Sequence, residues 1–132
     1  MKILAALLLK HPCLDTRTGV SIKVPNEPFM ELTIESIGCG EGGRPALSIC
    51  HYGEQNGDLM RDPEMCFEYE RTASGFVFHP YYWHNDYVGV VREGREPAQV
   101  AAHWAFARQW DANLKSQGFL REIEAGKEVV NG

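Results

Sequence analysis

Apolar and polar residues alternate along several short segments of the chain, and a period of two is typical of strands with one buried face. The pattern is clearest in residues 29–37 (FMELTIESI) and 64–70 (EMCFEYE). It also marks residues 20–24, 46–52 and 75–84, and residues 88–91 form a short further strand or a strand end. Glycine, proline or asparagine separates these segments, so we expect an antiparallel sheet of about five strands in meander order.

Two segments have helical patterns instead. In residues 98–117 the main apolar side chains fall within a stripe about 160° wide, and Pro97 and Gly118 bound the segment. Residues 1–12 (MKILAALLLKHP) are expected to form a short buried helix, with a first strand as the alternative. This apolar run is shorter than the roughly 20 residues of a membrane span, and no signal-peptide cleavage site follows it. We therefore expect an α+β fold with the long C-terminal helix, and the N-terminal helix if it forms, packed on one face of the sheet.

The length of 132 residues fits a single domain whose core is stable without disulfide bonds. Residues 127–132 carry few side chains that could anchor them, and we expect this tail to fray. The four cysteines are scattered and include no C-x-x-C pair, which suits a reducing compartment. We expect a cytoplasmic protein.

The negative charge of the chain lies in one segment. Residues 54–70 contain six acids and one base, which accounts for the whole formal charge of −5. The acids are Glu54, Asp58, Asp62, Glu64, Glu68 and Glu70. Asn56-Gly57 is a tight-turn signal, so we expect residues 54–70 to form an acidic hairpin. The chain lacks a basic footprint, and we expect neither nucleic acid nor a membrane surface as a direct partner.

The sequence offers two candidate sites for ions. The glycine-rich residues 38–45 (GCGEGGRP) lack the ending of a phosphate loop and precede a strand instead of a helix, so a plain hairpin connection is favoured. The residues His51, Asp58, Asp62 and Glu64 are suitable ligand types for magnesium, manganese or zinc, but their spacing matches no metal motif. A turn in which Asp58 and Asp62 bond to the backbone is favoured over a metal site. We expect no cofactor.

An aromatic and histidine-rich run follows in residues 79–87 (HPYYWHNDY). Both faces of a strand here carry rings, so one face can pack on the helix while the other contacts a protein partner. Tyr81, Trp83 and Tyr87 are the candidates for this contact. Stacking of nucleic-acid bases is less favoured, because no basic residues are interleaved with the rings. Pro80 predicts an edge strand or a bulge.

No residue has the sequence context of a catalytic nucleophile. The cysteines lie in no recognisable motif for thiolate activation, and Ser48 and Ser74 lie in no G-x-S-x-G elbow. His103 falls near the centre of the apolar stripe of the long helix, where a buried neutral histidine is the commoner case. A general base at this position, paired with an acid from the sheet, is the alternative.

Three segments of the chain carry a family resemblance: HYGEQNGDLMRDPEMCFEYE, FHPYYWHNDYVGVVRE and FARQWDANLKSQGF. They resemble an uncharacterised domain, domain-of-unknown-function family 6908, found in bacterial plasmids, integrative elements and phages. The match covers roughly residues 32–119 and is most specific in EQNGDLMRDPEM, residues 54–65, whereas residues 1–28 lie outside it. One departure is Gly53, where a second aromatic residue is expected. The resemblance implies a small α+β protein and brings no known activity and no catalytic residues.

These observations favour a non-enzymatic binding module of a mobile element, in which the acidic hairpin contacts a basic protein surface. In that setting a host-defence protein is a natural basic target, which makes an anti-restriction or anti-CRISPR role the specific version of the hypothesis. One alternative is a metal-dependent hydrolase built on the four candidate ligands. Another is a structural homodimer that pairs through an edge strand at residues 75–84.

Overall fold

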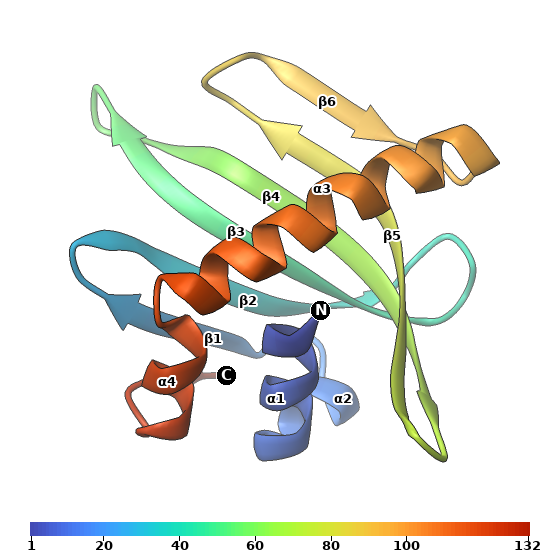
Figure 1. The fold of residues 1–132 in the computed structure, drawn as a ribbon, viewed down its shortest axis with the longest axis horizontal. Coiled ribbons are helices and arrows are strands. Elements are labelled where there is room, and N and C mark those ends of the chain that lie inside the picture. Colours follow the sequence, from blue (N-terminus) through green and yellow to red (C-terminus); the bar gives the residue numbers. More distant parts are fainter.

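The computed structural model describes residues 1–132 and contains one antiparallel sheet of seven strands with helices across one face (Figure 1). The strands are β1 (Ser21–Asn26), β2 (Phe29–Cys39), β3 (Pro45–Gln55), β4 (Asp58–Thr72), β5 (Gly75–Asn85), β6 (Val90–Glu93) and β7 (Val129–Asn131). Their order in the sheet is β6-β5-β4-β3-β2-β1-β7, so β1 to β6 form a meander. The α+β class is confirmed, but the expected number of about five strands was wrong.

The C-terminal tail supplies one of the additional strands. We expected residues 127–132 to fray, whereas Val129–Asn131 pairs with β1 at the edge of the sheet. Glu128, just before β7, accepts hydrogen bonds from Lys10 Nζ at 2.8 Å and His11 Nε2 at 2.7 Å. These partners are more than a hundred residues away in sequence, so no local pattern could indicate them. The short strand or strand end predicted at residues 88–91 is the separate strand β6, which begins two residues later and pairs with Tyr82–Asn85 of β5.

Four helices accompany the sheet. They are α1 (Lys2–Lys10), α2 (Cys13–Thr16), α3 (Pro97–Ser116) and α4 (Phe119–Glu124). The helical prediction for the N-terminal segment is confirmed over the strand alternative, and α3 begins and ends within a residue of its predicted bounds. A capping box between Glu96 and Gln99 starts α3, and Gly118 with a φ of 94° separates it from α4. No helix is long and apolar enough to cross a membrane.

The core lies between the sheet and the helices α1, α3 and α4 (Figure 1). The predicted alternation is confirmed in β4, where Met65, Phe67 and Tyr69 are buried on the helix side. Burying an apolar side chain of this size is worth about 1.5–3 kcal/mol, so this face carries much of the stability. The other side of the sheet has no helix packed on it, and we call it the open face.

Candidate functional site

The six acids of the predicted acidic hairpin do not form one surface. They follow β3 and β4, and a strand of 15 residues such as β4 is roughly 50 Å long. Glu64 lies on the open face, whereas Asp62 lies on the helix side, where it accepts a hydrogen bond from Asn85 Nδ2 at 2.9 Å. A bulge opposite His51 causes this separation, because it places Arg61 instead of Asp62 on the same face as Glu64.

Besides Asp62, three of these acids are bonded within the protein. Glu64 accepts a hydrogen bond from Ser48 Oγ at 2.6 Å, and Glu70 accepts one from His79 Nε2 at 3.2 Å. Glu70 also lies 3.0 Å from Arg44 Nε. Glu68 is fully buried and bonded to Gly42 and Arg95. The free negative charge of the hairpin is therefore smaller than its composition indicates.

Glu68 lies beneath the glycine-rich loop and has no exposed surface. Its carboxylate accepts hydrogen bonds from Gly42 N at 2.8 Å and Arg95 Nη1 at 2.7 Å. Burial alone would raise the pKa of Glu68, but these hydrogen bonds outweigh it and hold the pKa below its ordinary value. A Cβ on Gly42 would lie 2.6 Å from this carboxylate, and Gly40 has no room for one either. Two of the four loop glycines are therefore required by the packing over Glu68, whereas Gly38 and Gly43 have positive φ.

The four candidate metal ligands do not converge. His51 lies on the helix side, with its ring centroid 5.7 Å from that of Trp110, and its Nδ1 lies 3.2 Å from the carbonyl oxygen of Glu31. Burial lowers the pKa of His51. Asp58 lies at the tip of the β3–β4 hairpin, and Glu64 lies on the open face. Nowhere in the chain do three His, Cys, Asp or Glu side chains form a group that could hold a metal ion.

The candidate aromatic residues are also divided. A bulge in β5 places Tyr81 on the same face as Tyr82 and away from Trp83. The guanidinium carbon of Arg95 lies 5.0 Å from the centroid of the Tyr81 ring. Trp83 faces the helices and contacts Phe106 of α3, with 5.6 Å between ring centroids. Tyr87 is 46% exposed, and its hydroxyl lies over Gly53, where a Cβ would collide with it. Gly53 therefore makes room for Tyr87, which gives a physical reason for the departure from the expected aromatic residue.

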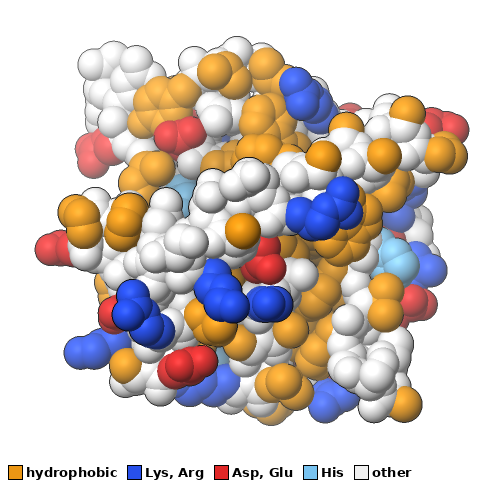
Figure 2. All heavy atoms as spheres, in the orientation of Figure 1, with side chains coloured by type: hydrophobic (Ala, Val, Ile, Leu, Met, Phe, Trp, Pro, Cys, Tyr) orange, Lys and Arg blue, Asp and Glu red, His pale blue; other side chains and the backbone are white.

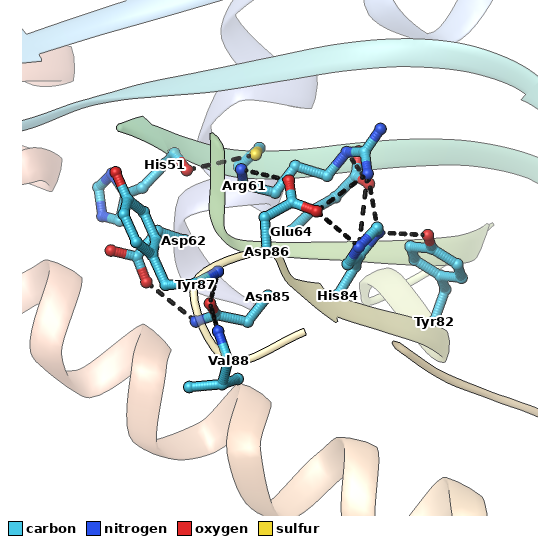
Figure 3. Close-up of polar contacts among 11 residues, drawn as sticks. His51, Arg61, Asp62, Glu64, Tyr82, His84, Asn85, Asp86, Tyr87 and Val88 are labelled. Atoms are coloured by element: carbon cyan, nitrogen blue, oxygen red, sulfur yellow. Dashed lines mark hydrogen bonds and ion pairs between the residues drawn. The ribbon is translucent and has the colours of Figure 1, made fainter. Parts of the chain in front are cut away.

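A polar network that the sequence did not indicate joins β4, β5 and the turn after β5 (Figure 3). His84 Nε2 lies 2.9 Å from Asp86 Oδ1, while its Nδ1 lies 2.9 Å from both Tyr82 Oη and Arg61 Nη1. The backbone N–H of Arg61 donates to Asp86 at 2.8 Å, and this bond is the largest cause of the lowered pKa of Asp86. Tyr82, His84 and Asp86 are neighbours in the sequence, but Arg61 is more than 20 residues from them, so only the fold brings it into the network.

The open face beside this network offers no reactive nucleophile. Cys50 and Cys66 lie there under longer neighbours, and burial raises the pKa of each thiol to about 12. Both thiols are therefore neutral at physiological pH, and the Ser48 hydroxyl donates to Glu64. His103 lies on the buried side of α3 and is 3% exposed, and burial lowers its pKa, so a general-base role would need a substrate to reach a ring with little exposed surface.

A groove of about 380 Å³ crosses the open face over β1, β2, β3 and the start of β4. Glu31 and Glu35 lie along it on β2, and neither carboxylate forms an ion pair or a side-chain hydrogen bond. Tyr52 and Leu59 form its other wall, and Leu59 is 71% exposed. Lys23 is the one basic residue of the lining. Free carboxylates next to apolar and aromatic contact area are the main feature of this groove.

The model of the family described as Domain of unknown function (DUF6908) matches residues 2–120, and the chain therefore belongs to that family. The match extends to the N-terminal helix, which the resemblance in the sequence did not cover. No curated protein and no solved structure matches the chain.

Proposed function

We propose that this DUF6908 domain is a protein-binding module whose open face contacts a basic surface of its partner. The observation that supports this most is the open-face groove, where Glu31 and Glu35 have no partner within the chain. Glu54 adds a third free carboxylate near the same face, next to Leu59 across the hairpin. In contrast, the acids Glu64 and Glu68 are already bonded within the protein.

The chemistry of the groove fits this role. Free carboxylates attract a basic surface over several ångströms and speed up its association, and they do so without being desolvated first. Tyr52 and Leu59 then supply contact area, since tyrosine and exposed apolar side chains contribute strongly where water is excluded. The proposal keeps the acidic binding module predicted from the sequence but moves its centre from the hairpin to the open face.

The resemblance to domains of plasmids, integrative elements and phages suggests a class of partner. Host proteins that handle nucleic acid have basic surfaces, and host-defence proteins are among them. An anti-restriction or anti-CRISPR role is the specific version of the proposal.

Charge reversal on the open face tests the proposal. The variant Glu31→Lys/Glu35→Lys is compared with Glu122→Lys/Glu124→Lys, which makes the same charge change on α4. Each protein is immobilised and exposed to host lysate at about 50 and about 200 mM salt, and bound proteins are identified by mass spectrometry. We expect a basic protein that binds the parent chain and the α4 variant, more weakly at higher salt, and does not bind the open-face variant. Equal capture by both variants would refute the proposal.

A homodimer is a second candidate, because half of β5 has a free edge. The strand β6 pairs only with Tyr82–Asn85, so residues 75–80 have no neighbouring strand on their outer side. This agrees with the prediction from Pro80, and an unpaired edge can add a strand from a second copy. Light scattering over a range of concentrations decides this: a monomer at every concentration excludes the dimer.

A further inference from the structure

A second groove, of about 590 Å³, lies on the helix side between the start of α1 and the second half of α3. Its lining residues are Lys2, Arg108, Asp111, Ala112, Lys115 and Ser116. The five α3 residues recur at intervals of three and four, so they share one face of the helix. Figure 2 shows basic side chains gathered around a hollow on this side of the molecule.

The groove has a local excess of positive charge in an acidic protein. The lining contains three basic residues, Lys2, Arg108 and Lys115, and one acidic residue, Asp111. Both oxygens of Asp111 already accept a hydrogen bond from the backbone N–H of Lys2, at 3.1 and 3.2 Å. Asp111 thus bonds the first N–H of α1, whose first turn contains no acidic residue. None of the three basic side chains forms an ion pair or hydrogen bond within the protein. In contrast, Arg95 forms an ion pair with Glu68.

The remaining lining indicates what kind of anion would fit. Ser116 adds a hydroxyl, Ala112 is the one apolar residue, and no aromatic ring is present on which a base or sugar could stack. The volume lies within the range of about 300–1,000 Å³ that is usual for small-molecule sites. The fork of an arginine matches two phosphate oxygens at once, and lysines add point charges beside it.

We propose that this groove binds a compact small molecule with two or more phosphate groups, with Arg108, Lys115 and Lys2 as its ligands. Three cations around one hollow repel one another when the groove is empty, and a polyanion removes that repulsion. The site lies on the opposite side of the sheet from the protein-binding face and is independent of it.

Calorimetric titration with inorganic tripolyphosphate tests the site, with orthophosphate as the less charged probe. The variant Arg108→Gln/Lys115→Gln is compared with Arg121→Gln/Lys127→Gln, which removes the same charge from exposed positions elsewhere. We expect tripolyphosphate to bind more tightly than orthophosphate. We expect its affinity to fall about tenfold or more in the groove variant and less than about twofold in the control.

Three results would overturn the proposal. The first is no binding of tripolyphosphate at millimolar concentration. The second is an equal loss of affinity in the groove and control variants, which would indicate attraction to net charge only. The third is tighter binding, through the same residues, of a short single-stranded oligonucleotide or of vesicles containing phosphatidylserine, which would assign the groove to a polymer or a lipid surface.

Discussion

Replacing Glu68 by glutamine tests whether the buried ion pair under the glycine-rich loop holds this end of the sheet together. Glutamine keeps the shape of the side chain and can still accept the N–H of Gly42, which lies 2.8 Å away in the parent structure. It loses the negative charge opposite Arg95, whose Nη1 lies 2.7 Å from the Glu68 carboxylate. The substitution therefore isolates the charge from the packing.

The expected loss of stability can be derived from burial. Removing one partner of a buried ion pair costs about 3–5 kcal/mol when the other charge stays buried. The Arg95 side chain is 34% exposed, so water can partly hydrate it in the variant. We therefore expect a smaller loss, about 2–3 kcal/mol, which for a chain of 132 residues lowers Tm by about 7–11 °C.

Urea unfolding of the parent chain and the Glu68→Gln variant measures this loss. The matched control is Glu70→Gln, on the same strand, which removes an exposed carboxylate paired with Arg44 and His79. Because exposed ion pairs contribute little, the control should unfold close to the parent chain. A Glu68→Gln variant as stable as the control would refute the argument that this buried pair stabilises the fold.

The same pair of proteins has a pH signature. The folded pKa of Glu68 lies below its ordinary value of 4.5, so the carboxylate contributes its full stability above that pH. The contribution is lost as the pH falls through the folded pKa, because the carboxyl is then protonated in both states. Glutamine does not titrate, so the difference in stability between the parent chain and the variant should narrow below about pH 4.5. A constant difference across this range would contradict the assignment.

Three further predictions concern other parts of the fold. Gly40→Ala should lower the unfolding free energy by about 1–3 kcal/mol, because the new Cβ would collide with the buried carboxylate; an unchanged urea midpoint would contradict this. A disulfide reagent at about pH 8 should modify the exposed Cys39 quickly but Cys50 and Cys66 only as fast as the protein opens, since burial raises the pKa of both thiols to about 12. Rapid modification of either buried thiol in the folded protein would contradict this prediction. His103→Leu should make the free energy of unfolding less dependent on pH between about 7 and 5, because burial lowers the pKa of His103 and only the unfolded chain takes up this proton as the pH falls through about 6.5. If the unfolding free energies of the parent chain and the variant, measured with urea, changed equally with pH, this prediction would be wrong.

The parts of the fold that the sequence predicted well are those set by local pattern. Alternation in residues 64–70 predicted a strand with one buried face, which Met65, Phe67 and Tyr69 form in the structure, and Asn56-Gly57 indicated the turn between β3 and β4. The tail strand β7 was missed because distant residues fix it, through pairing with β1 and through Glu128. Local composition carries no information about such contacts.

The site was harder to predict, because two bulges reverse the alternation on which the assignment of faces depends. A strict period of two would place Asp62 with Glu64, and Tyr81 with Trp83, whereas the structure separates both pairs. Counting charge in a segment had a second weakness, because it treats Glu68 as if it were exposed. An acid that is paired within the protein contributes little free negative charge to the surface.

The two grooves differ in net charge, since acids outnumber Lys23 in the open-face groove and cations outnumber Asp111 in the groove on the helix side. Glu31 and Glu35 lie on the open face, Arg108 and Lys115 lie beyond the helix layer, and packed layers are about 10 Å apart, close to the Debye length at physiological salt. The two pairs therefore influence each other little, and their effects should be additive. Reversing the open-face acids should leave the tripolyphosphate affinity within about twofold, and neutralising the groove cations should leave partner capture intact. If either variant abolished both activities, the two faces would instead belong to one continuous site, such as a head-to-tail contact between copies of the chain.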